Sequence, residues 1–128
     1  MKEHFQSLIH FYFNNKNLTI NNNIVTLTVN DKLEINIIYI EETFTIHISA
    51  YISEIKDNER INIYERLLIG NYLCSDSADG TLGICPDKKH IVYSYKTSAS
   101  INDIEFKDCI NSIIEKSLKF KNSFSISH

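Results

Sequence analysis

An alternating pattern of apolar and polar side chains over residues 25–52 constrains the fold more than any other feature of the chain. Residues 25–29 and 44–52 alternate strictly, and residues 33–40 are rich in isoleucine. Alternation with a period of two places successive side chains on opposite faces of a β-sheet. Asn30-Asp31 and Glu41-Glu42 separate the three segments and are residue types that favour turns. We therefore expect three antiparallel strands in a meander.

Helical patterns flank these strands on both sides. In residues 3–14, apolar side chains recur at the i, i+3, i+4, i+7 spacing of one helical face, and the Asn-rich stretch 14–23 then ends the helix. A second helix is expected over residues 59–73, with Asp57 or Asn58 as its N-cap. The strand meander is thus expected between two helices.

The C-terminal part of the chain is expected to add a hairpin and a final helix. Residues 81–85 and 90–96 have the pattern of short strands, joined by a turn at Pro86. The last helix is expected to begin near Asn102, which can cap the first turn while Glu105 reaches back. The predicted class is α+β, in the order α-β-β-β-α-β-β-α, with a twisted antiparallel sheet flanked by helices. A chain of this length is expected to form one domain, residues 1–128, with a flexible tail from about residue 121.

Charge and cysteine content argue against several classes of partner. The chain has 13 basic and 16 acidic residues, a net charge of -3 and no basic run that could neutralise a phosphate backbone, so no nucleic acid is expected. The first residues lack a signal peptide's apolar region, and no apolar stretch is long enough to cross a bilayer. Three widely spaced cysteines, Cys74, Cys85 and Cys109, favour free thiols in a reducing cytoplasm.

No sequence motif points to an active site. The three glycines form no phosphate-binding loop, and no two histidines have the i, i+4 spacing of metal ligands on a helix. The loop 75–80 resembles a calcium loop only loosely, because serines occupy two carboxylate positions and Pro86 stands where the closing Glu belongs. A site assembled in space from serine or cysteine stays open at this point. We expect no enzyme, no cofactor and no metal.

Both of the first two helices carry more apolar surface than one core needs. The apolar arc of the first helix is about twice as wide as a core-facing stripe. Either its aromatic side chains pack within the monomer, or part of them contacts a partner. The second helix is apolar on two sides, so we expect one side to pack on its own sheet and the other to contact a second copy. One side carries Ile61, Tyr64, Leu68 and Tyr72, and the other carries Ile63, Leu67 and Gly70.

Two short motifs follow a known family pattern. Leu67-Leu68-Ile69-Gly70-Asn71 is similar to a Leu-Leu-x-small-Asn signature, and Gly80-Thr81-Leu82-Gly83-Ile84 is similar to a Gly-x-x-Leu-Gly strand. With the element order, they resemble the small acidic class I chaperones of bacterial type III secretion, over roughly residues 3–120. The chain departs from that family in its polar stretch Asn21-Asn22-Asn23 and in having no Trp near the end of the last helix.

The resemblance implies a cytoplasmic bacterial homodimer that binds the non-globular N-terminal region of a secretion effector and keeps it soluble and secretion-competent. The cargo is expected in extended form, adding strands to sheet edges and short helices to apolar grooves. The predicted cargo-binding residues are Phe5, Leu8, Ile9, Tyr12, Phe13, Leu33, Ile35 and Ile37. The predicted dimer interface consists of Ile63, Leu67, Gly70 and Asn71. The alternative is a generic dimeric adaptor domain that binds proteins without a role in secretion.

Overall fold

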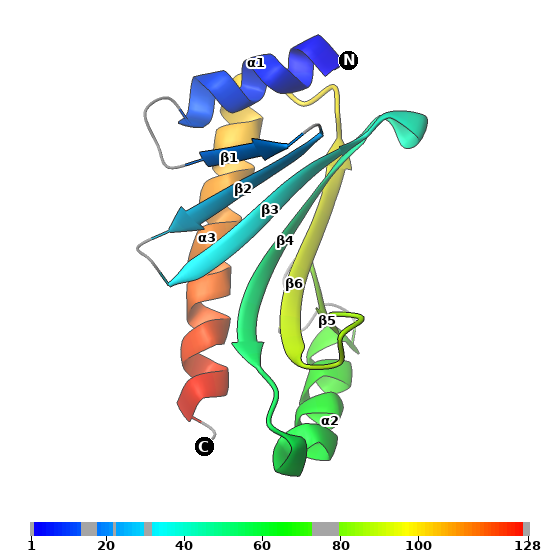
Figure 1. The fold of residues 1–128 in the computed structure, drawn as a ribbon, viewed down its shortest axis with the longest axis vertical. Helices are drawn as coiled ribbons and strands as arrows, with labels where there is room; N and C mark the ends of the chain where they lie inside the picture. The colour runs from blue at the N-terminus through cyan, green and yellow to red at the C-terminus, as the bar shows by residue number, and fades with distance from the viewer. Residues whose placement is uncertain (1, 14–17, 22, 30–31, 73–79, 127–128) are drawn as a thin grey trace.

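The computed structural model describes residues 2–13, 18–21, 23–29, 32–72 and 80–126. Three α-helices, two short 3-10 helices and one antiparallel sheet make up this part of the chain (Figure 1). In chain order the elements are α1 (Lys2–Phe13), β1 (Leu18–Asn21), β2 (Ile24–Val29), β3 (Leu33–Ile40), η1 (Glu41–Thr43), β4 (Thr45–Glu54), η2 (Asp57–Glu59), α2 (Arg60–Asn71), β5 (Thr81–Ile84), β6 (His90–Ser98) and α3 (Asp103–Ile126). The predicted α+β class is confirmed.

The sheet has the strand order β1-β2-β3-β4-β6-β5, and its neighbouring strands are antiparallel. β2, β3 and β4 form the predicted meander, and β5 and β6 form the predicted hairpin. One strand was missed, because β1 pairs with β2 from Leu18↔Leu27 to Asn21↔Ile24, inside the stretch that the sequence predicted to be a connector. Leu18 and Ile20 alternate with Thr19 and Asn21, but this four-residue pattern does not stand out within the Asn-rich stretch around it. The predicted turn at Asn30-Asp31 lies outside the described residues.

Alternate side chains of β3 and β4 point to one side of the sheet and form the centre of the core. The register pairs buried residues with each other, Ile35 with Ala50 and Ile37 with Ile48. Helix α3 runs along this face of the sheet and packs against β4, while α1 crosses it at one end and contacts α3 (Figure 1). The period-two alternation in the sequence is therefore a direct record of which side chains the helices cover.

Helix α2 lies at the other end of the molecule, against the edge strand β5 (Figure 1). The expected N-cap at Asp57 or Asn58 was wrong, because the 3-10 turn η2 precedes the helix and moves its N-cap to Glu59, which makes no side-chain capping bond. Asp57 instead accepts a hydrogen bond from the Arg60 guanidinium at 2.7 Å. The entry to α2 is thus held by an exposed ion pair rather than by a cap.

Helix α3 begins as the sequence predicted. The Asn102 Oδ1 atom accepts a hydrogen bond from the Glu105 backbone N–H at 2.8 Å, and the Asn102 side-chain amide donates to Glu105 Oε1 at 2.5 Å. The helix continues through Ile126, beyond residue 121, where the sequence predicted a flexible tail to start. Among the described residues, no helix has the length and apolar character that crossing a membrane requires.

Candidate protein-binding surfaces

Six of the eight side chains predicted to bind cargo lie in the core of the monomer. On α1, Phe5 stacks on Tyr39 of β3 with ring centroids 5.5 Å apart. The side chains of Tyr12 and Phe13 lie outside the described residues. The other six are no more than 3% exposed: Phe5, Leu8, Ile9, Leu33, Ile35 and Ile37. Within one chain they hold α1 on its own sheet and offer almost no apolar surface, so a contact with cargo stays a prediction.

The side chains predicted to form the dimer interface also face the interior. Ile63 and Leu67 are at most 5% exposed, and Gly70 is buried. Asn71 is partly buried and hydrogen-bonds both backbone groups of Leu82, at 2.6 and 2.9 Å, which fixes the rotation of α2 against β5. With that rotation, the Leu67 side of the helix packs on the sheet. Its participation in a dimer stays a prediction.

The outward side of α2 and the residue after its end carry four exposed large apolar side chains. They are Ile61, Leu68, Ile69 and Tyr72, which are 80%, 74%, 60% and 72% exposed. Single exposed apolar side chains are common on proteins, whereas a contiguous set on one helix marks an association surface. We call these four residues the outer α2 face. The sequence showed the helical repeat of Ile61, Leu68 and Tyr72 but not that this side faces solvent.

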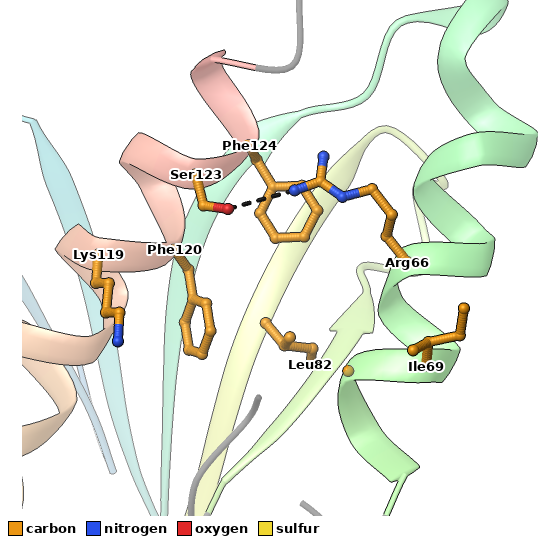
Figure 2. Close-up of a pocket in the computed structure, with 8 residues that line it drawn as sticks. Arg66, Ile69, Leu82, Lys119, Phe120, Ser123 and Phe124 are labelled. Carbon is orange, nitrogen blue, oxygen red and sulfur yellow. Dashed lines mark hydrogen bonds between the residues drawn. The ribbon is translucent and has the colours of Figure 1, made fainter. Parts of the chain in front are cut away.

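A groove of about 440 Å³ separates α2 from the C-terminal turns of α3 (Figure 2). We call it the α2–α3 groove, and its lining residues are Arg66, Ile69, Gly70, Leu82, Lys119, Phe120, Ser123 and Phe124. Arg66 reaches across it, with its guanidinium carbon 4.3 Å from the centre of the Phe124 ring and an N–H donated to Ser123 Oγ at 3.3 Å. Sequence analysis missed this groove because its two walls are about fifty residues apart in the chain.

The two edges of the sheet differ in how their backbone groups are satisfied. At the β5 edge, the Asn71 carboxamide takes both backbone groups of Leu82. At the other edge, β1 pairs with β2 on one side, and no strand of the described residues pairs with its outer side. An edge strand with open backbone groups is a template for strand addition by another chain.

The titratable side chains of the β5–β6 turn form a small cluster with a structural role. Asp87 accepts hydrogen bonds from the Lys89 backbone N–H at 2.8 Å and pairs with His90 at 2.7 Å. The hydrogen bond from Lys89 has the larger effect and the one with His90 the smaller, and together they hold the pKa of Asp87 below its usual value. A hydrogen bond with Cys85, at 3.8 Å, is the main cause of the raised pKa of Tyr51. No group of three or more His, Cys, Asp or Glu side chains in the described ranges is placed to hold a metal.

This combination defines a class: an α+β protein-binding domain with an exposed apolar helix face, an apolar groove and an open sheet edge. The same fold occurs in solved complexes. One is the ExsC-ExsE complex, with a TM-score of 0.68 and 11% identity, covering 94% of this chain and 89% of that chain. Another is the HopA1-SchA chaperone-effector complex, with a TM-score of 0.68 and 8% identity, covering 94% and 91% of the two chains.

A third solved structure with this fold is the Yersinia pestis type III secretion chaperone SycH in complex with a stable fragment of YscM2. Its TM-score is 0.64 at 12% identity, and the alignment covers 91% of this chain and 98% of that chain. A search of curated protein sequences finds no match to this chain. The family model of the Tir chaperone protein (CesT) family matches residues 11–121, and the chain belongs to that family. The resemblance to type III secretion chaperones predicted from the sequence is confirmed.

Proposed function

We propose that this member of the Tir chaperone family binds the non-globular N-terminal region of a type III secretion effector in the bacterial cytoplasm and keeps it soluble and secretion-competent. The observation that carries the proposal is the family match over residues 11–121. The fold adds support, because the HopA1-SchA chaperone-effector complex has the same fold. Residues 1–128 act in this proposal as one chaperone domain.

The chaperone is proposed to act as a homodimer joined through the outer α2 face. Its members Ile61 and Leu68 are more than 70% exposed, and packing them against a second copy would remove their apolar surface from water. The interface residues predicted from the sequence support this face from beneath. They are Ile63, Leu67, Gly70 and Asn71, which hold α2 on β5.

The cargo is proposed to bind in extended form along the sheet and the first helix. Strand addition at the outer side of β1 would satisfy its open backbone groups and requires no particular cargo sequence. Six of the predicted cargo residues contribute by seating α1 and β3: Phe5, Leu8, Ile9, Leu33, Ile35 and Ile37. A contact of Tyr12 and Phe13 with cargo is proposed from the sequence alone. A disordered segment loses entropy on binding, so a large contact surface gives an affinity that can still be reversed.

We further propose that this function needs no catalysis, cofactor or ATP. The family is a chaperone family. Release of the cargo then depends on competition for the same contacts, since the binding free energy of a segment that orders on binding is a small difference between large terms.

Co-expression with effectors from the same genome tests the proposal. The expected result is a soluble complex in which a segment near the effector's N-terminus resists protease, and the matched control is the same effector without that segment. Two results together would contradict the proposal. The effector would stay soluble and protease-sensitive without the chaperone, and it would bind the chaperone no better with the segment than without it. Binding to a folded domain instead would support the generic adaptor.

A further inference from the structure

We infer that the α2–α3 groove binds an acidic, apolar segment of the cargo, placing an apolar side chain between the two helices and a carboxylate beside Arg66 and Lys119. The inference rests on the proposed function and adds to it the chemistry of one cargo segment. It concerns a site between the second and third helices, away from α1 and β1.

The interior of the groove is built for an apolar side chain. Leu82 of β5 lies at its base, with Gly70 of α2 on one side and the rings of Phe120 and Phe124 on the other (Figure 2). Leu82 and Phe124 are fixed in the core, at 4% and 6% exposure. The volume of about 440 Å³ is within the range of sites that bind compact ligands. It is large enough for an aromatic or aliphatic side chain together with its backbone.

The positive charge of the groove favours a cargo segment that carries negative charge. Among the described residues that line the groove, two are cations, Arg66 and Lys119, and none is Asp or Glu. Figure 2 shows them on opposite walls, with Lys119 on α3 and Arg66 extending from α2 over Phe124. Stacking on an aromatic ring holds a guanidinium in place, and guanidinium and ammonium groups both form charge-assisted hydrogen bonds with carboxylates. A segment with Glu or Asp next to Leu, Ile or Phe complements this arrangement, and a basic segment does not.

The position of the groove indicates cargo rather than a second copy of this chain. Ile69 belongs both to the groove and to the outer α2 face, so the groove opens directly beside the proposed dimer contact. A second copy does offer an acidic apolar surface, because Glu65 lies between Ile61 and Leu68 on the exposed side of α2. In the proposed dimer that surface packs against its own copy, which leaves the groove for a third chain.

Two matched peptides test the inference directly. Each is a short amphipathic helix with Leu and Phe at i, i+3, i+4 and i+7, and its flanking positions are all Glu in one peptide and all Lys in the other. We expect the Glu peptide to bind the full-length chaperone about tenfold more tightly by fluorescence anisotropy, since two cations contribute. Equal binding of the two peptides would overturn the inference.

Charge reversal locates the site. Lys119→Glu should weaken the Glu peptide roughly fivefold, and Lys107→Glu, an equally exposed charge reversal near the start of α3, should leave it within about twofold. Equal losses in both variants would show general charge attraction and overturn the site. A change of the dimer's mass in Lys119→Glu, by sedimentation, would show instead that a second copy occupies the groove.

The cargo itself separates this inference from the proposed function. The wild type and the Lys119→Glu variant are co-expressed with the effector in one culture, where they compete for it. If both capture the effector equally, the groove is not a cargo site, although the proposed chaperone function stands. Preferential capture by the wild type supports the groove. If the wild type captures no effector, the proposed function and the inference that rests on it both fail.

Discussion

Asn71 at the end of α2 hydrogen-bonds both backbone groups of Leu82 on the edge strand β5. Its Nδ2 donates to the Leu82 carbonyl at 2.6 Å, and the Leu82 N–H donates to its Oδ1 at 2.9 Å. A carboxamide presents a donor and an acceptor as a peptide group does, so Asn71 replaces the next strand at this position. The same pair fixes α2 on the sheet and thereby determines which of its two apolar sides meets solvent.

Replacing Asn71 should therefore cost more stability than its partly exposed position suggests. Asn71→Ala should lower the free energy of unfolding by about 1–3 kcal/mol, because both Leu82 backbone groups lose their partner. Asn71→Asp should cost at least as much, since a carboxylate cannot donate to the Leu82 carbonyl. Urea unfolding measures both, and Asn62→Ala on the exposed side of α2 is the control. Equal stabilities of Asn71→Ala and Asn62→Ala would refute this role.

The two glycines beside β5 should respond in opposite ways to alanine. A Cβ on Gly80 would lie 2.5 Å from the Tyr93 ring and 2.7 Å from the Ser94 backbone oxygen, and neither the buried ring nor the backbone can move away easily. Gly80→Ala should lose about 1–3 kcal/mol of stability through overpacking.

Gly83 is the matched control, because a Cβ there would have no neighbour within 4 Å. Gly83→Ala should be neutral or slightly stabilising, since alanine restricts the unfolded chain. Thermal unfolding of the two variants in parallel gives the comparison. A Gly80→Ala variant with the wild-type melting temperature would mean that the approach of Gly80 to Tyr93 is not required for the fold.

The sequence predicts most of the strands well because the apolar residues of each strand are the ones that are buried. The isoleucines of β3 and β4 alternate with polar residues, and the observed register buries the same positions, such as Ile37 against Ile48. β1 was missed although Leu18 and Ile20 alternate with Thr19 and Asn21, because a four-residue pattern does not stand out within an Asn-rich stretch. Its strand conformation depends on pairing with β2, which composition does not report.

The faces of α2 show a different limit of sequence analysis. Its pattern indicates two apolar sides but contains nothing that says which side packs on the sheet. That choice depends on a contact between Asn71 and Leu82, which are eleven residues apart in the chain, and the helical pattern does not predict this contact. The α2–α3 groove was missed for a related reason, because Arg66 meets Phe124 only through the tertiary fold.

Substitutions at the adjacent residues Leu67 and Leu68 distinguish the dimer interface predicted from the sequence, which contains Leu67, from the outer α2 face, which contains Leu68. Leu68→Asp places a charge on the outer α2 face, where the side chain is 74% exposed, and should leave the fold intact while converting a dimer to a 14.9 kDa monomer in light scattering. Leu67→Asp buries a charge at a position 3% exposed and should lower stability by more than about 3 kcal/mol. A folded monomer from Leu67→Asp, with Leu68→Asp still dimeric, would restore the interface predicted from the sequence.

The thiol of Cys109 should be slow to react in the folded protein. Cys109 is a free cysteine, and desolvation by burial raises its pKa to about 11, with nearby Lys116 lowering it by less. Only the thiolate is nucleophilic, so at pH 8 the reactive fraction is roughly a hundredfold below that of an ordinary cysteine with a pKa near 8.5.

A chain with Cys74→Ser and Cys85→Ser isolates this thiol for measurement. Alkylation with iodoacetamide at pH 8 should be roughly a hundredfold slower in the folded protein than in guanidinium, and the rate should rise about tenfold per pH unit up to pH 10. The sign follows from the raised pKa, because the neutral thiol predominates until the pH approaches 11. A folded rate that levels off near pH 9 would show that α3 does not shield Cys109, and would place this part of the helix closer to solvent than its packing on β4 implies.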